Sequence, residues 1–215
     1  MMTDDGSNTA VDFWFDPVCP WTWLTSRWIL EVRKFRSIDI NWHVMSLAVL
    51  NEARMDELPE RIRDLMQRSW APVRVLMAAQ DRLGPAILEP LYNALGSRYH
   101  PLDQPVERVT IEAALAEVGL SSDLAGVGET DTYDAALRES HRAGITLVGG
   151  EVGSPIIAVP SADSPTGKIA FFGPVVTPTP KGEHAVGLWD GILAVARTPG
   201  FYEIKRTRTL GPDYD

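Results

Sequence analysis

The only cysteine of this 215-residue chain, Cys19, stands in the short motif Cys19-Pro20-Trp21-Thr22. A cysteine thiolate attacks disulfides and small electrophiles, and a cysteine at the start of a helix has a lowered pKa. The unpaired N–H groups and the positive end of the helix dipole cause that lowering, and the Thr22 hydroxyl can donate a further hydrogen bond to the sulfur. The motif therefore predicts an accessible, reactive monothiol. The alternatives are a small buried apolar side chain for Cys19 and a hydroxyl that satisfies backbone donors for Thr22.

A strand and a helix must hold this motif in place. Residues 11–15 (VDFWF) favour a strand, which Asp16 and Pro17 end, and Pro20 suits the first turn of a following helix. Cys19 is therefore expected at a strand-to-helix junction. The apolar face of the predicted helix, at helical spacing, consists of Leu24, Trp28, Val32 and Phe35.

The rest of the chain extends this start into an α/β fold. Residues 38–47 read as a second strand, and the stretch 53–143 carries the 3.6-residue periodicity of four to six helices with no strand between them. A glycine-rich loop with a Ser-Pro step at 154–155 then leads into a short buried strand, followed by a strand at 168–173 and a helix at 182–196. The predicted order is β–α–β, a helical block, then β–β–α.

Composition excludes several classes of function. The formal net charge of −9 argues against binding nucleic acid or anionic membranes, and the basic stretch at 205–209 is expected to be a solvated segment. One cysteine permits no internal disulfide, which fits a reducing compartment. The acidic start, residues 1–10, is no secretory signal, and no apolar run reaches membrane-spanning length. We therefore expect a cytoplasmic protein.

The motifs and their order resemble the thioredoxin fold in its DsbA-like form, and within it the actinobacterial mycothiol-dependent nitroreductases. The segments that carry the likeness are FWFDPVCPW, TSRWILEV, HVMSLAVLNE, GSPIIAV, YDAALRESHRAG, FFGPV, GLWDG and FYEIKRTRT. The resemblance implies a thioredoxin-like core of residues 1–52 and 144–215, interrupted by a helical insertion at 53–143. It also implies mycothiol as electron donor, a disulfide or nitro-compound as substrate, and a possible homodimer.

The resemblance also suggests roles for individual residues. It implies a cis peptide bond at Pro155 that holds the Ser154 backbone beside Cys19. Without the resemblance, an ordinary proline that opens a strand is the better interpretation of Pro155. Trp21 is expected as an exposed ring over a pocket, whereas Trp23 is expected in the core. Asn51 is a candidate substrate contact near the active-site mouth, against the commoner role of a loop or helix-cap residue. Pro20, which completes the turn, belongs to the same candidate thiol-binding surface.

The sequence departs from the nitroreductase pattern at Thr22, where family members carry a second cysteine. Because a hydroxyl cannot resolve a mixed disulfide, dithiol cycling within this chain is excluded. The likeness also extends to the kappa-type glutathione transferases and chromene-carboxylate isomerases, whose turn resembles Ser-Pro-Tyr-Ser. Three functions remain open: a monothiol oxidoreductase that works with mycothiol, a transferase or isomerase that binds a thiol without net redox change, and a non-catalytic binding protein.

No metal or nucleotide cofactor is expected. The four histidines show no paired spacing, and one cysteine cannot build a structural zinc site. His141 is expected on a helix surface rather than in the cleft. The glycine-containing stretch 126–130 follows no strand and lacks the third glycine of a dinucleotide loop.

Overall fold

A computed structural model describes residues 8–214. The expectation that residues 1–10 are no secretory signal falls mostly on residues 1–7, which lie outside this range. Among residues 8–214, no helix is long and apolar enough to cross a membrane.

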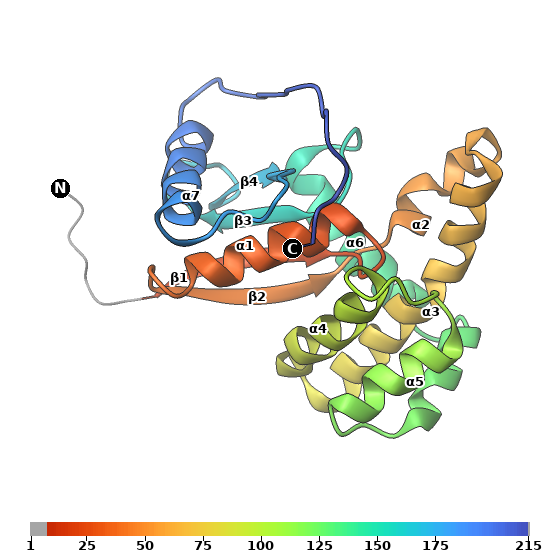
Figure 1. The fold of residues 1–215 in the computed structure, drawn as a ribbon. Helices are drawn as coiled ribbons and strands as arrows, with labels where there is room; N and C mark the ends of the chain where they lie inside the picture. The colour runs from red at the N-terminus through yellow and green to blue at the C-terminus, as the bar shows by residue number, and fades with distance from the viewer. Residues whose placement is uncertain (1–7, 215) are drawn as a thin grey trace.

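A four-stranded mixed sheet forms the centre of the protein (Figure 1). Its central strand β1 (Thr9–Phe15) runs parallel to β2 (Ile38–Val44) and antiparallel to β3 (Ile156–Pro160). The edge strand β4 (Lys168–Phe172) is antiparallel to β3. These strands confirm the α/β class and the four predicted β-segments.

Helices cover both faces of this sheet. On one face, α1 (Pro20–Val32) packs against α7 (Gly182–Ala196), and the buried Trp28 indole N–H donates to the Ala185 carbonyl at 3.0 Å. On the other face lies α6 (Asp134–Val148), as Figure 1 shows. Helices on both faces of a mixed sheet are what the thioredoxin-like fold implies, although the predicted core of residues 1–52 and 144–215 leaves out most of α6.

Alternation along β1 explains how each face is filled, because successive side chains of a strand point to opposite sides. Phe13 and Phe15 belong to the large core cluster that includes the buried side chains of α1 and α7. Trp14 points to the other face, where its indole N–H donates to the Ser140 carbonyl of α6 at 3.1 Å. A Cβ added at Gly144 would lie 2.8 Å from the Trp14 ring, so glycine permits this close approach.

A helical block lies between β2 and β3, as expected. Its helices, with the short 3₁₀ segments between them, are α2 (Leu47–Asn51), η1 (Glu52–Glu57), α3 (Glu60–Leu83), η2 (Pro85–Ile87), α4 (Leu88–Tyr99), α5 (Arg108–Glu117) and η3 (Ser122–Glu129). The block is closed by α6, within which the predicted boundary at 143/144 falls. Since α6 packs on the sheet as well as on α3, we propose that the insertion ends before this helix and that α6 belongs to the core.

The insertion docks on the first turns of α1 through Trp23. This ring is buried, as expected, and stacks edge-on to Tyr92 of α4 at 5.9 Å between centroids. A Cβ added at Gly96 of α4 would come within 2.3 Å of the Trp23 ring. A small residue at position 96 therefore sets how closely the helical block approaches the Cys19 loop.

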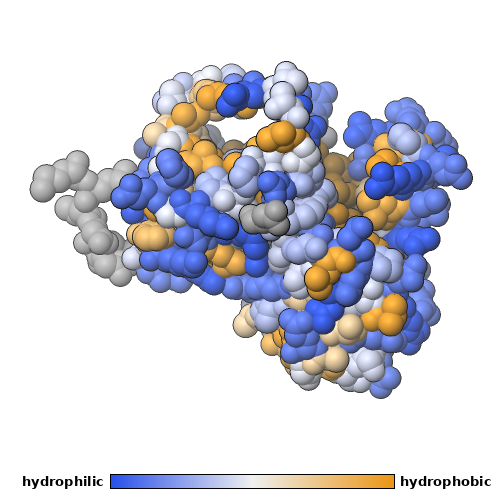
Figure 2. Space-filling view, in the orientation of Figure 1, coloured by the Kyte–Doolittle hydropathy of each residue, from blue (hydrophilic) through white to orange (hydrophobic). Residues whose placement is uncertain are grey.

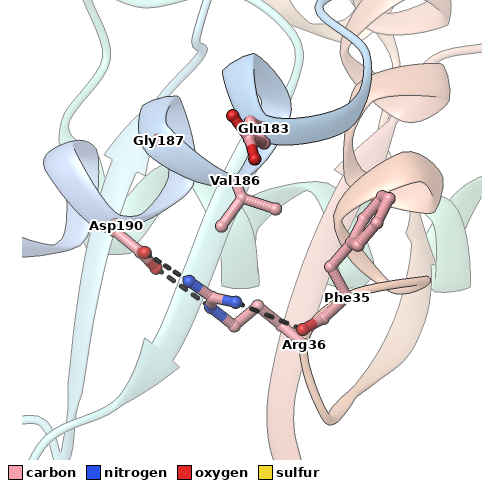
Figure 3. Close-up of a pocket in the computed structure, with 6 residues that line it drawn as sticks. All are labelled: Phe35, Arg36, Glu183, Val186, Gly187 and Asp190. Atoms are coloured by element: carbon pink, nitrogen blue, oxygen red, sulfur yellow. Dashed lines mark hydrogen bonds and ion pairs between the residues drawn. The ribbon is translucent and has the colours of Figure 1, made fainter.

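The predicted apolar face of α1 is wrong at Phe35. Leu24, Trp28 and Val32 are buried, but the helix ends at Val32 and Phe35 is 52% exposed. The chain tightens there, since the N–H of Phe35 donates to the Val32 carbonyl, and this turn carries the ring out of the helical repeat. Phe35 and Arg36 line an open pocket of about 380 Å³ against α7, and Arg36 forms an ion pair with Asp190 along its wall (Figure 3).

Candidate active site

The loop between β1 and α1 presents Cys19 as the N-cap residue of the helix. The Cys19 N–H donates to the Asp16 carbonyl at 3.1 Å, and the Cys19 carbonyl accepts the N–H of Trp23. Pro20 takes the first helical position, where its missing N–H leaves no donor unpaired. The predicted placement at the helix tip is confirmed.

The loop before β3 meets this helix tip. The Ser154–Pro155 peptide bond is cis, as the resemblance implied. The Cys19 thiol donates to the Ser154 carbonyl with 3.5 Å between sulfur and oxygen. The hydroxyls of Thr22 and Ser154 lie 2.6 Å apart. Cys19, Thr22, Ser154 and Pro155 thus form one cluster, in which the start of α1 meets a loop more than 130 residues away in sequence.

Cys19 is neither exposed nor acidic, contrary to the sequence-based expectation. The residue is only 5% exposed, and burial raises the pKa of its thiol above the ordinary value. Hydrogen bonds from the Thr22 hydroxyl and from the N–H groups of Thr22 and Trp21 act in the opposite direction, but loss of hydration outweighs them. The groups that would stabilise a thiolate are therefore in place, while water is kept away from the sulfur.

Asp16 ties three loops together beneath Cys19. Its carboxylate accepts the N–H of Val18 at 2.9 Å and the N–H of Leu47, at the start of α2, at 2.7 Å. Its own N–H donates to the Ser154 hydroxyl at 3.2 Å. Asp16 is fully buried, and burial raises its pKa to about 7 against the lowering effect of the two N–H donors. The sequence marked Asp16 only as the end of a strand, because its other partners are distant in the chain.

Two further predicted site residues have different surroundings. Trp21 is partly buried rather than open, and the Arg208 guanidinium lies over its ring at 5.4 Å from the centroid. Asn51 lies at the end of α2, where its amide donates to the Leu47 carbonyl at 2.8 Å and its oxygen accepts from Arg54. These contacts are those of a helix-end residue, and they do not bring Asn51 to the Cys19 cluster.

Two histidines lie closer to the site than the sequence indicated. His141, expected on a helix surface, is only 7% exposed, and its Nδ1 accepts the N–H of Ser46 at 3.4 Å. The expectation was wrong because the face of α6 that carries His141 packs against the sheet. His100, at the end of α4, is also buried, with Nε2 3.0 Å from the Pro17 carbonyl in the Cys19 loop. Burial lowers its pKa to about 4.

The best-formed cavities do not reach the thiol. The cavity beside Phe35 and a second one of about 490 Å³ between the start of α3 and Val106 both lie away from Cys19. Within the described part of the chain, no group of three or more His, Cys, Asp or Glu side chains is placed to bind a metal ion. Neither of these two cavities is lined by Cys19.

The fold and the site define a thioredoxin-fold protein of DsbA-like architecture, with its cysteine at the tip of α1 beside the cis-proline loop. The chain belongs to the Rv2466c-like family, described as mycothiol-dependent nitroreductase Rv2466c, whose model matches residues 18–206. It is 29% identical over 207 residues to the uncharacterized protein Rv2286c of Mycobacterium tuberculosis (strain ATCC 25618 / H37Rv), covering 94% of this chain and 83% of that one.

Solved structures share the fold. The probable DsbA oxidoreductase SCO1869 from Streptomyces coelicolor has a TM-score of 0.57 at 15% identity, covering 96% of this chain and 97% of that chain. The cytosolic disulfide reductase DsbM from Pseudomonas aeruginosa has a TM-score of 0.54 at 14% identity, with coverages of 86% and 98%. DsbM has also been solved with GSH. The family and the fold together point to thiol oxidoreductase chemistry.

Proposed function

We propose that this protein is a thiol-dependent oxidoreductase in which Cys19 alone carries the covalent step and mycothiol is the reducing co-substrate. The observation that supports this most is the contact of the only thiol, at the tip of α1, with the Ser154 carbonyl of the cis-proline loop. Membership of a family described by mycothiol dependence supports the choice of thiol. The binding of GSH by DsbM, on a similar fold, fits a small-thiol partner.

The chemistry requires no second cysteine in the chain. The Cys19 thiolate attacks the mixed disulfide of mycothiol with a substrate thiol, a sulfur–sulfur bond forms to Cys19, and the substrate leaves as its thiol. A second mycothiol then attacks the Cys19 mixed disulfide, which releases mycothiol disulfide and restores the Cys19 thiol. One free mycothiol is oxidised per turnover, and the other half of the mycothiol disulfide comes from the substrate, so the mixed disulfide and mycothiol give mycothiol disulfide and the substrate thiol. A nitro-compound is the other substrate class, and its two-electron reduction to the nitroso compound would consume two mycothiol thiols and release mycothiol disulfide and water.

The neighbouring residues have distinct tasks in this proposal. The Thr22 hydroxyl and the first N–H groups of α1 stabilise the thiolate once water reaches it. The Ser154 backbone holds the incoming thiol beside the sulfur, and Trp21 with Pro20 forms one wall of the entrance. Asn51 has no task in this proposal. We further propose a cytoplasmic location, because a free thiol cycling with a reducing thiol needs a reducing compartment.

Intact-mass measurement tests this proposal. After exposure of the full chain to mycothiol disulfide, we expect the mass of one mycothiol on the wild type and none on Cys19→Ser. Reduced mycothiol should remove the adduct. Failure to form the adduct, in a protein whose thiol still reacts with iodoacetamide, would overturn the proposal.

A transferase or isomerase is the second candidate, and the Thr22–Ser154 hydroxyl pair favours it. The hydroxyl at position 22 matches the kappa-type and isomerase turn better than the dithiol turn. Such an enzyme would bind the thiol without oxidising it. The stoichiometry of mycothiol disulfide formed per turnover separates the two candidates, since the oxidoreductase forms one and the isomerase none.

A binding protein on the same scaffold is the third candidate, and the burial of Cys19 favours it. It predicts that the thiol stays inert however the surrounding segments are altered. The variants described next provide that measurement.

A further inference from the structure

The chain after α7 returns to the tip of α1. We call residues 198–214 the covering segment. It has no helix or strand, and it runs from the end of α7 to the region of α1 and α4, as the dark blue trace in Figure 1 shows. Figure 2 shows this segment as an arch that stands off the body of the protein above a hollow. The segment is therefore held mainly at its far end.

Contacts at three places, Thr177, Trp21 and His100, hold that end. The Thr177 hydroxyl donates to the Gly211 carbonyl at 3.3 Å and accepts the N–H of Asp213 at 2.9 Å. The Arg208 guanidinium lies over Trp21, the residue two positions after Cys19. These contacts place the covering segment against the stretch between β4 and α7 and against Trp21, two residues after Cys19.

The third place of contact is His100 at the end of α4, and the contact there is aromatic. The Tyr214 ring lies 5.7 Å from the His100 ring, and His100 in turn is bonded to the Pro17 carbonyl in the Cys19 loop. The charge of Cys19 contributes, after burial, to a raised pKa of Tyr214, so the phenol lies within electrostatic range of the sulfur. Tyr214 thus lies beside His100, whose ring contacts the loop that carries Cys19.

We propose that the entrance bounded by Trp21 and His100 is a binding site for an aromatic group, that Tyr214 of the covering segment fills it, and that Cys19 becomes reactive only when this segment lifts. This reconciles a complete set of thiolate-stabilising groups with a thiol that is closed to solvent. It goes beyond the proposed function and requires nothing of mycothiol.

The rest of the segment is built to detach. Its large apolar side chains are exposed: Phe201, Tyr202, Ile204 and Leu210, of which Tyr202 is 94% exposed. Tyr214 itself is 36% exposed, so its ring is only partly covered and can leave His100 readily. Segments with few buried contacts and exposed backbone open at low free-energy cost, far below that of global unfolding. The basic stretch at 205–209 is exposed as the sequence predicted, apart from the contact of Arg208 with Trp21.

The test is the alkylation rate of the single thiol by iodoacetamide in the native full chain. Tyr214→Ala should raise this rate roughly tenfold, the factor that corresponds to loss of about 1.4 kcal/mol of contact. Tyr202→Ala is the matched control, because this tyrosine of the same segment is 94% exposed and should leave the rate unchanged. A chain ending at Thr198 should react at least as fast as Tyr214→Ala.

A synthetic peptide of residues 206–214 identifies the site itself. Added to the chain that ends at Thr198, this peptide should slow alkylation again, and the same peptide with alanine in place of Tyr214 should not. Wild-type rates in both Tyr214→Ala and the shortened chain would overturn the inference, as would an equal increase in Tyr202→Ala. Since iodoacetamide replaces mycothiol throughout, failure here is distinct from failure of the proposed function.

Discussion

Replacing Asp16 by asparagine removes the one buried charge beneath Cys19, and the effect on stability is large and dependent on pH. Burial raises the pKa of this carboxyl to about 7, whereas an unfolded chain gives it a pKa of about 3.9. A carboxyl whose folded pKa is raised stabilises the fold fully below the unfolded pKa. That contribution is lost as the pH rises through the folded pKa. Between pH 4.5 and 7.5 the loss amounts to about 3 kcal/mol, at about 1.36 kcal/mol per pKa unit.

Urea unfolding of wild type and Asp16→Asn at the two pH values measures this effect. The asparagine amide cannot accept both the Val18 and the Leu47 N–H, which destabilises the variant by about 1–3 kcal/mol. This cost is the same at both pH values and cancels when the change with pH is compared between the two proteins. Asp163→Asn, on an exposed loop, is the control.

As the pH rises from 4.5 to 7.5, we expect the free energy of unfolding of the wild type to fall by about 3 kcal/mol relative to that of Asp16→Asn. The Asp163→Asn protein should follow the wild type. Since the Asp16 charge also opposes ionisation of the nearby thiol, the variant should alkylate with a lower half-point. Equal pH dependence in Asp16→Asn and wild type would refute the reasoning, because it would mean that Asp16 ionises as readily when buried as when exposed.

Gly96→Ala should destabilise the protein by about 1–3 kcal/mol, because the new Cβ overlaps the Trp23 ring. Gly187→Ala in α7 is the control, since open space surrounds that position. Equal melting temperatures of Gly96→Ala and the wild type would contradict this prediction. Thr22→Val should raise the half-point of Cys19 alkylation, since the thiolate loses a hydroxyl donor, whereas Thr25→Val, which breaks bonds to backbone carbonyls only, should not. Burial lowers the pKa of His100 to about 4, so the wild type should lose about 3 kcal/mol of unfolding free energy as the pH falls from 7 to 4. His100→Asn should remove this loss. An unfolding free energy that depends on pH equally in both proteins would count against it.

Local pattern was enough to predict most of the fold. The strand at 11–15 and the helix at 182–196 are found where hydrophobic alternation and helical spacing placed them. Cys19 is found at the helix tip because Pro20 signals a first helical turn in any context. The cis bond at Pro155 was predicted by resemblance rather than by physics, since a proline at the start of a strand is ordinarily trans.

Contacts between distant segments explain what was missed. Helical spacing included Phe35, but the chain turns after Val32 and ends the repeat. His141 lies on a polar-looking helix that is nonetheless packed on the sheet. Asp16 and His100 gain their surroundings from residues that are 30 to 140 positions away in the chain, and no local pattern carries that information.

The same reason accounts for the wrong expectation about Cys19. The turn and the helix dipole were predicted correctly, and they provide hydrogen bonds that lower the pKa of the thiol. The covering segment, almost 200 residues later in the chain, contributes the closure that the short motif could not indicate. Accessibility is a property of the whole fold, whereas the chemistry of the motif is local.

Turnover by Cys19→Ser tests the central claim most directly. The assay follows formation of mycothiol disulfide while reduced mycothiol reduces its mixed disulfide with a small thiol, in wild type, Tyr214→Ala and Cys19→Ser. We expect turnover in the first two proteins, faster in Tyr214→Ala, and none above the uncatalysed rate in Cys19→Ser. Turnover that persists in Cys19→Ser would contradict the account, because the reaction would then proceed without the sulfur assigned to it.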